Sequence, residues 1–153
     1  MREKIFFNHD QNFWMNVPSD DAIAVKNLKE EYGISDEMLT YSLDKNERAR
    51  VEYDSLDDAL LLVTNVPHQQ KIENHYETSP VAFILKDGGL FTFTTKNTEY
   101  VIRLLNALLE RDSEVSVYSL LFRTLFLISG SFFPLIEEVN SERQRLNLSL
   151  IHI

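Results

Sequence analysis

The sequence predicts an α+β fold with three layers, in which helices cover both faces of a mixed β-sheet and the chain ends in a long helix. Apolar residues alternate with period two in some segments and recur with period 3.6 in others, which indicates both strands and helices. The helical segments follow the first strands and then the last strands, whereas a doubly wound fold alternates helices with every strand. At 153 residues the chain has the length of one domain, so residues 1–153 are expected to form a single unit.

The first third of the chain predicts two short strands and a helix. Residues 5–8 and 13–17 are the strands, separated by a polar turn. The helix begins in the stretch 18–21, where Ser19 is the expected N-cap because its hydroxyl can accept a backbone N–H. Gly33 ends this helix, since glycine adopts the left-handed conformation without steric cost.

A second helix and two strands follow directly. The helix covers residues 35–44 and is capped by its first residue, a serine. From residue 49 the period changes to two, and Val51 and Tyr53 are expected on the buried face of a half-buried strand. Residues 60–63 are apolar on both faces, as in a central strand.

The middle of the chain predicts a β-hairpin. Residues 81–85 and 90–95 are strands that flank a Lys-Asp-Gly-Gly turn at 86–89. Glycine accepts the positive φ angles of such turns at little cost, so this is a strong hairpin signal. The polar residues 67–78 before it predict a loop or a hairpin tip.

The last third of the chain predicts helices. Asn97 or Thr98 is the expected cap of the first helix. A long apolar helix then extends from about residue 115 through residue 139, and Pro134 can kink it. Residues 143–153 continue the helical pattern with further leucines, so this segment is expected to need a partner surface.

The composition excludes several classes of function. A formal net charge of −9 disfavours a surface for nucleic acid or anionic lipid, so no nucleic-acid partner is expected. The absence of cysteine excludes disulfides and thiolate metal sites. The longest uncharged stretch, residues 124–136, is shorter than the about 20 apolar residues of a spanning helix, and no secretory signal is visible. A cytosolic location is therefore expected.

No catalytic constellation is present in the sequence. The four histidines lack the spacing of a metal site, and no serine lies in a nucleophile-elbow context. Asp57 and Asp58 are adjacent, so on an extended backbone their carboxylates point to opposite faces, which predicts a turn rather than an acid–base pair. We therefore expect a protein that is not an enzyme, with no catalytic and no cofactor-binding residues. A third interpretation, a small hydrolase, is not supported, because the sequence shows no nucleophile–base pair.

The order of elements in residues 13–63 resembles the N-terminal cytoplasmic domain of the CorA family of divalent-cation transporters. That family shows a Trp-led strand, a helix ending near Phe/Tyr-Gly-Ile, a short helix with Leu-Glu-Asp, an Arg-Pro-Lys-Val/Ile-Glu strand and an apolar strand. The matching pieces here are Trp14, Tyr32-Gly33-Ile34, Leu39, Arg48-Ala49-Arg50-Val51-Glu52-Tyr53 and residues 60–63. The likeness continues through the predicted hairpin to about residue 139.

The resemblance implies a cytosolic regulatory domain, with an ion-sensing and gating role, of a magnesium or other divalent-cation transporter. It also implies a homopentamer of the full-length protein at the cytoplasmic face of the cell membrane, with the protein's own transmembrane segment downstream. This chain contains neither the family's Gly-Met-Asn nor a pair of spanning helices. It is therefore expected to be a soluble fragment that does not conduct ions itself.

One departure concerns the regulatory metal site of the family. Where the family has Leu-Glu-Asp, this chain has Leu39-Thr40-Tyr41. In the family, that Asp helps to bind a cation between subunits. A neutral phenol is a poor ligand for a hard cation such as Mg²⁺, which prefers carboxylate oxygens.

Nearby acidic residues are the remaining metal candidates. Asp36, Glu37 and Asp44 are weak candidates for ligands of Mg²⁺ or another divalent cation, and no tightly bound cofactor is expected. The resemblance makes Thr40, Tyr41 and Asp44 the candidates for subunit contacts. The same short helix would then carry both the ion ligands and the contact with other copies.

A second hypothesis belongs to a different class of protein. The chain could be a free-standing soluble ligand-binding or protein-interaction domain with no role in transport. Two spanning helices encoded downstream of residue 153 would distinguish the transporter from the free-standing domain.

Overall fold

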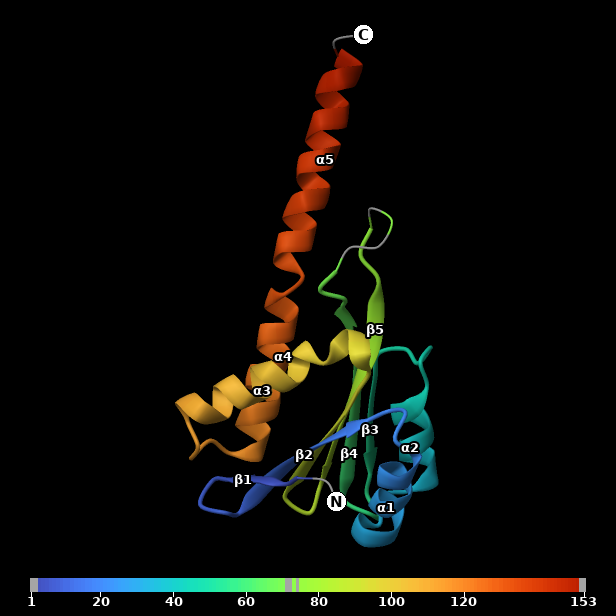
Figure 1. Ribbon diagram of the computed structural model, residues 1–153, viewed down its shortest axis with the longest axis vertical. Helices are drawn as coiled ribbons and strands as arrows, with labels where there is room; N and C mark the ends of the chain where they lie inside the picture. Colours follow the sequence, from blue (N-terminus) through green and yellow to red (C-terminus); the bar gives the residue numbers. More distant parts are fainter. Residues whose placement is uncertain (1–2, 71–72, 74, 152–153) are drawn as a thin grey trace.

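A mixed β-sheet of six strands lies at the centre of the molecule (Figure 1). The computed structural model of the chain describes residues 3–70, 73 and 75–151. Across the sheet, the strands of this described part follow the order β1-β2-β6-β5-β4-β3. The strands are β1 (Ile5–Phe7), β2 (Asn12–Pro18), β3 (Arg50–Asp54), β4 (Ala59–Pro67), β5 (Thr78–Lys86) and β6 (Gly89–Thr94).

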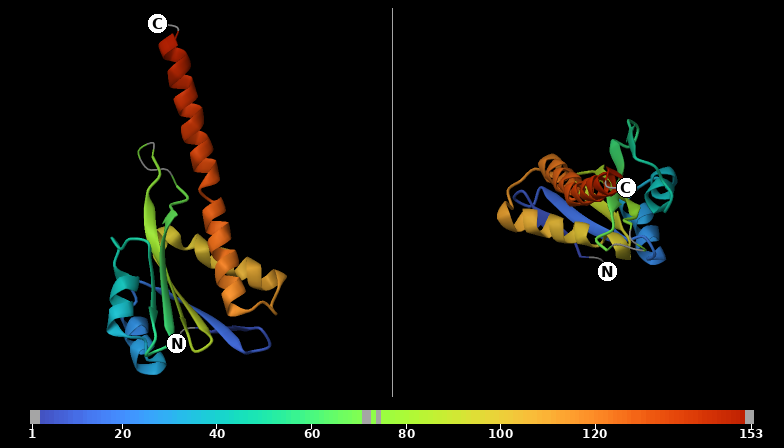
Figure 2. Two further views of the ribbon diagram at one scale, coloured as in Figure 1. Left: turned by 180° about the vertical axis from the view of Figure 1, so that it is seen from behind. Right: turned by 90° about the horizontal axis from the view of Figure 1, so that it is seen from above.

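Helices cover both faces of the sheet, which confirms the predicted α+β fold with three layers (Figure 2). They are α1 (Ala22–Tyr32), α2 (Asp36–Leu43), the 3₁₀ turn η1 (Lys96–Thr98), α3 (Tyr100–Arg111), α4 (Val117–Gly130) and α5 (Phe133–Ile151). α1 and α2 lie on one face, and α3 and α4 lie on the other. α5 extends away from the sheet and projects beyond the rest of the molecule. Among the described residues, no helix combines the length and the apolar character needed to cross a membrane.

The strands β2 and β6 are parallel neighbours, whereas the other four pairings of the described strands are antiparallel. Their register places Phe13 opposite Gly89 and Pro18 opposite Thr94. Parallel neighbours cannot be joined by a tight turn and need a long crossover. Here the crossover contains α1, α2 and the strands β3 to β5. Both parallel strands end at the same edge of the sheet.

Each face of the sheet buries its own hydrophobic core, because successive residues of a strand point to opposite faces. On the side of α3 and α4, Phe83 of β5 packs with Leu105 and Leu120. On the side of α1 and α2, the next residue, Ile84, packs with Leu28. All of these side chains are fully buried, and burial of each contributes about 1.5–3 kcal/mol to stability.

The strand β3 has the opposite sidedness from the one predicted. Val51 and Tyr53 are 69% and 62% exposed, whereas Arg50 and Glu52 are half-buried and face α2. The reason is position: β3 is an edge strand, and the described helices leave the Val51 face of it open. The alternation of the sequence was therefore correct as a strand signal but wrong about which face is buried.

The first two helices begin and end with side-chain and backbone caps. Asp21, not Ser19, is the N-cap of α1, and its Oδ1 accepts a hydrogen bond from the N–H of Ala24 at 3.0 Å. The helix starts later than predicted, and the Ser19 hydroxyl donates instead to the Thr94 carbonyl of β6. Gly33 ends α1 at φ 66°, which confirms the predicted left-handed stop. Ser35 caps α2 by accepting from the N–H of Met38, as predicted.

The β5–β6 hairpin is confirmed. Asp87 and Gly88 form its turn, and both have positive φ, at 50° and 79°. Two successive left-handed residues are typical of the type I′ turn, whose twist matches that of the flanking strands. The segment 67–78 contains the end of β4 and the start of β5, and residues 71, 72 and 74 within it lie outside the described part.

The C-terminal segment forms two helices rather than the one long helix predicted. α4 ends at Gly130 and α5 begins at Phe133, with the Ser131 N–H donating to the carbonyl of Leu127 at 3.1 Å. Pro134 is the second residue of α5, where its missing N–H leaves no hydrogen bond unmade. The proline therefore starts a helix here instead of kinking one.

The start of α3 also differs from the prediction. Its N-cap is Glu99, whose side chain makes no capping hydrogen bond, instead of Asn97 or Thr98. Thr98 instead belongs to the 3₁₀ turn η1 that precedes α3. Its hydroxyl accepts a hydrogen bond from the N–H of Thr95 at 2.9 Å and so closes this turn. The 3₁₀ turn η1 thus leads the chain into α3 without a side-chain cap at Glu99.

Candidate functional site

The residues predicted as metal ligands and subunit contacts all lie on or next to α2. Asp36 and Glu37 occupy the first turn, where the positive end of the helix dipole favours acidic side chains. Thr40 and Tyr41 lie one turn further, and Asp44 follows the last helical residue. About two turns of helix separate the acidic residues of the first turn from Asp44.

Asp36 already has a cationic partner within the chain. Its Oδ2 accepts a hydrogen bond from Lys29 Nζ at 2.9 Å. Both side chains are exposed, so this ion pair adds little to stability. The hydroxyl of Thr40 donates to the Asp36 carbonyl at 2.8 Å, so it is used within its own helix.

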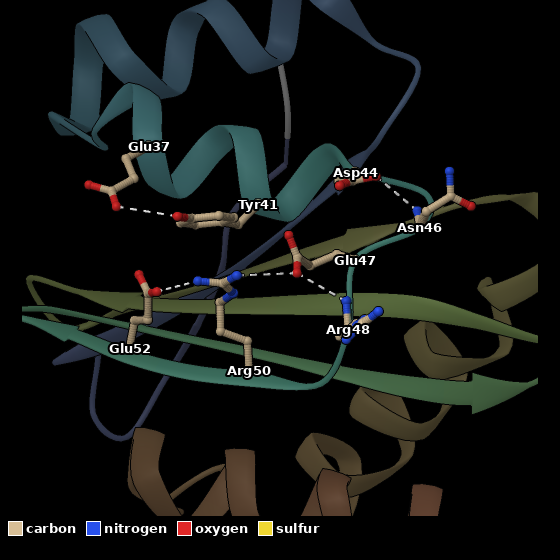
Figure 3. A network of polar contacts seen from close by, with 8 residues as sticks. All are labelled: Glu37, Tyr41, Asp44, Asn46, Glu47, Arg48, Arg50 and Glu52. Carbon is tan, nitrogen blue, oxygen red and sulfur yellow. Dashed lines mark hydrogen bonds and ion pairs between the residues drawn. The ribbon is translucent and has the colours of Figure 1, made fainter.

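Tyr41 forms a platform for a cation of the chain itself. Its ring lies over the guanidinium of Arg50 on β3, with 3.9 Å between Arg50 Cζ and the ring centroid (Figure 3). The Tyr41 hydroxyl points to the first turn of α2 and donates to Glu37 Oε1 at 3.5 Å. A guanidinium stacked on an aromatic face is favourable because the ring face is electron-rich.

Arg50 is held between two carboxylates below this ring (Figure 3). Its Nη1 donates to Glu52 Oε1, and its Nη2 lies 3.5 Å from Glu47 Oε1. The hydrogen bond to Glu52 raises the pKa of Arg50, and the charge of Glu47 acts in the same direction, so the guanidinium stays charged. Arg50 therefore places a positive charge directly under the Tyr41 ring.

Asp44 takes part in the turn between α2 and β3. Its Oδ1 accepts from the N–H of Asn46 at 2.9 Å. In the same turn, Glu47 Oε1 accepts from the N–H of Arg48 at 3.0 Å. These contacts order the connection that places β3 under α2 (Figure 3).

The structure therefore distributes the candidate ligands over separate interactions. Asp36, Glu37 and Asp44 each contact a different group, and the described residues hold no cluster of three or more His, Asp or Glu side chains suited to a metal ion. The resemblance implies a metal site at α2 that takes further donors from a second chain. This metal site stays a prediction. The Arg50–Tyr41 stack was not predicted, because it depends on which face of β3 turns towards α2.

Comparison with known proteins identifies the family. The pattern of the family described as "CorA-like Mg2+ transporter protein" matches residues 9–152. The fold is similar to that of the soluble domain of CorA from Methanocaldococcus jannaschii, with a TM-score of 0.72, 22% identity, and coverage of 98% of this chain and 60% of that chain. It is also similar to the complete structure of the CorA magnesium transporter from the same organism, with a TM-score of 0.74, 23% identity, and coverage of 98% and 47%.

A further similar structure is the ZntB cytoplasmic domain from Vibrio parahaemolyticus, with a TM-score of 0.71, 14% identity, and coverage of 85% of this chain and 52% of that chain. This chain thus spans about half to three fifths of the length of these structures. No curated protein sequence matches it. The family pattern covers almost the whole chain, and the folds agree over nearly the same extent. The chain therefore belongs to the family of CorA-like Mg²⁺ transporter proteins.

Proposed function

We propose that this chain is the cytosolic regulatory domain of a CorA-like transporter of Mg²⁺ or another divalent cation. The observation that carries this proposal is the family match over residues 9–152. The similarity of the fold both to an isolated CorA soluble domain and to part of a complete CorA transporter supports it. In this proposal the natural protein continues into a transmembrane segment downstream, and the chain lies at the cytoplasmic face of the membrane.

The domain acts through contacts with other protein surfaces and not through catalysis. In α4, the exposed residues Tyr118, Phe122 and Phe126 follow one another at intervals of four and form a single stripe. They are 63%, 65% and 77% exposed, which is unusual for large aromatic side chains of a monomer. This stripe supports an assembly of identical subunits, which the family resemblance suggests is a homopentamer.

Ion sensing in this assembly takes place at α2. A cation bound by Asp36, Glu37 or Asp44 together with donors of a neighbouring copy stabilises the arrangement in which those donors meet. Thr40 and Tyr41 lie on the same helix and make the surrounding contact between subunits. The ion closes the transporter by its higher affinity for the closed assembly, and its loss releases the gate.

The test is Mg²⁺ uptake by the full-length natural protein in liposomes that contain a Mg²⁺-sensitive dye. We expect uptake that is inhibited by millimolar Mg²⁺ on the cytosolic side. Replacing Asp36 and Asp44 by Asn should raise the half-inhibiting Mg²⁺ concentration by roughly 5-fold or more, because these carboxylates bind the ion that stabilises the closed assembly. Asp57→Asn and Asp87→Asn change exposed acids in the β3–β4 and β5–β6 turns, outside α2, and serve as matched controls.

Two outcomes would contradict the proposal in different ways. Absence of Mg²⁺ or other divalent-cation uptake would overturn the transport role and favour a free-standing ligand-binding or protein-interaction domain. Normal uptake with unchanged inhibition in the Asp36/Asp44 variant would keep the transport role and reject ion sensing at α2.

A further inference from the structure

The carboxyl ends of β2 and β6 form a topological switch point. The two strands are parallel neighbours, but the helices that follow them in the chain lie on opposite faces of the sheet. β2 leads to α1 on one face of the sheet, and β6 leads through η1 to α3 on the other face (Figures 1 and 2). Helices that diverge in this way leave a crevice outside the strand ends, which is where open α/β sheets commonly bind ligands.

A cavity of about 720 Å³ opens at this switch point. Its walls come from the β2–α1 connection, the end of α2, the start of β5 and the β6–α3 connection. The volume lies within the range of roughly 300–1,000 Å³ that is typical of sites for small molecules. The crevice is separate from the Tyr41–Arg50 stack, because neither of these residues lines it.

The floor of the crevice is polar and held in one arrangement. Asn16 Oδ1 accepts from the hydroxyl of Thr92 at 2.7 Å, and Asn16 Nδ2 donates to the hydroxyl of Thr94 at 3.1 Å. The Ser19 N–H donates to the Thr94 carbonyl at 2.9 Å and joins the two strand ends. Because Thr92 and Thr94 are buried, these hydrogen bonds fix the floor before any ligand arrives.

The rim carries charges of both signs that no ion pair of the described residues uses. Asp20 lies on the β2–α1 connection and Lys45 follows α2. Lys96 and Glu99 lie on the opposite wall, in and after η1. By contrast, Lys29 next to α2 is paired with Asp36, and Arg50 below α2 is paired with Glu47 and Glu52. The wall beside α2 thus offers one free ammonium and two carboxylates, because Asp44 also lines it and uses one oxygen for the Asn46 N–H. The opposite wall offers one free ammonium and one free carboxylate.

The apolar part of the lining completes the site. Pro18 and Leu43 lie on the α1–α2 side, and Pro80 and Ile102 lie on the side of β5 and α3. All four are half-buried, so each has apolar surface that a ligand can cover. The crevice therefore combines free charges of both signs with a small apolar wall and a fixed polar floor.

We propose that this crevice binds a small zwitterionic molecule of the amino-acid class. Its carboxylate meets Lys96, its ammonium meets Asp20 on the other wall, and its side chain lies on the apolar wall. A multiply charged anion is disfavoured by the carboxylates, and a divalent cation is disfavoured by the two ammonium groups. A zwitterion satisfies both signs of charge at once. The proposal goes beyond the transport role and does not depend on it, because its charged contacts are Lys96 and Asp20, whereas the crevice shares only Asp44 with the proposed ion site.

The test is binding of each of the twenty common amino acids to the chain, by calorimetry and by thermal unfolding. A ligand that binds only the folded state at about tenfold above its Kd should raise the melting temperature by roughly 3 °C or more. Lys96→Gln and Asp20→Asn remove one contact of each sign, and each should weaken binding by about tenfold or more. Lys26→Gln is the matched control, because Lys26 is exposed on α1 and does not line the crevice.

The proposal is overturned if none of the twenty amino acids binds, or if only inorganic phosphate or MgCl₂ stabilises the chain. It is also overturned if an amino acid binds with the same affinity to the Lys96 and Asp20 variants as to the Lys26 control. Circular dichroism spectra of the variants check that each is folded, since all three substitutions are at exposed positions.

Discussion

At the scale of single residues, Tyr100 shows how a buried polar group joins two elements. It is the first residue of α3, and its hydroxyl donates to the carbonyl of Pro67 at the end of β4, at 2.7 Å. The side chain is buried, and this burial raises the pKa of Tyr100 because it disfavours the phenolate. The hydrogen bond thus depends on a proton that the folded state holds more tightly than the unfolded state.

Tyr100 is expected to make the chain sensitive to alkaline pH. Below about pH 10 the phenol is neutral in both states, and its contribution to stability is constant. As pH rises through about 10, the unfolded state loses the proton first, so the free energy of unfolding falls until the folded state also ionises. Tyr100→Phe should lower stability by about 1–3 kcal/mol at neutral pH, because the Pro67 carbonyl loses its partner.

Urea titrations between neutral pH and about pH 11 measure both effects. The Tyr100→Phe variant should lose less stability at alkaline pH than the wild-type chain does. Tyr118→Phe is the control, because Tyr118 is exposed and the substitution removes the same hydroxyl. An equal alkaline loss in the wild-type and Tyr100→Phe chains would contradict this account.

At the scale of elements, the contact between β2 and β6 depends on a glycine. A Cβ at Gly89 would lie 2.4 Å from Phe13 Cζ, which is closer than real Cβ contacts allow. The Phe13 ring cannot move freely, because it packs against Tyr32 and Phe91 at centroid distances of 5.8 and 5.5 Å. The glycine therefore lets the first residue of β6 approach its parallel partner.

Gly89→Ala is expected to destabilise the chain by about 1–3 kcal/mol through overpacking. Gly130→Ala is the matched control, because apart from its chain neighbours and the nearby backbone of α4 no atom lies within 4 Å of the added Cβ. Alanine also favours this helical end by up to about 1 kcal/mol. Chemical denaturation measures the two differences. If both variants have the same stability, the aromatic contact does not restrict this position. Adding Phe13→Leu to Gly89→Ala should recover part of the loss.

Local patterns predicted the elements of the fold well and their termini less well. Strand and helix periods are properties of short segments, so the hairpin at 86–89 and the stop at Gly33 could be read directly. The sequence predicts Ser19 instead of Asp21 as the N-cap, because both residue types cap helices and the choice depends on where Ser19 finds another partner. The buried face of β3 depends on its edge position, which no local pattern contains.

At the scale of the whole molecule, the site depends on which strands become neighbours. The crevice exists because β6 pairs with β2, and the Arg50–Tyr41 stack exists because α2 lies over β3. The sequence could suggest α2 as a place for function through its resemblance to a family. It could not predict either arrangement from composition or spacing, since both require the completed sheet.

The assembly proposed for α2 predicts a dependence of Mg²⁺ stabilisation on protein concentration. If Asp36 and Asp44 hold an ion together with a second copy, Mg²⁺ should raise the melting temperature by about 2–4 °C at high protein concentration and much less in dilute solution. Differential scanning calorimetry over a series of protein concentrations measures this. The Asp36→Asn/Asp44→Asn variant should lose the effect, and Asp57→Asn/Asp87→Asn should retain it. A shift of equal size at all protein concentrations would indicate a site within one chain instead.

The parallel pairing of β2 with β6 also sets the order of events when the chain is synthesised. Asn16 and Thr92, which bond across this pair, are 76 positions apart. At 5–20 residues per second, roughly 4–15 s separate the appearance of the two strands. Within the β3–β4–β5–β6 portion all pairings are antiparallel, so it can close by short connections, but β2 can pair with β6 only after this portion has been synthesised. During that interval Trp14 and Val17, both buried in the finished sheet, have no core to enter, and we expect this N-terminal hairpin to be the part of the nascent chain that chaperones protect.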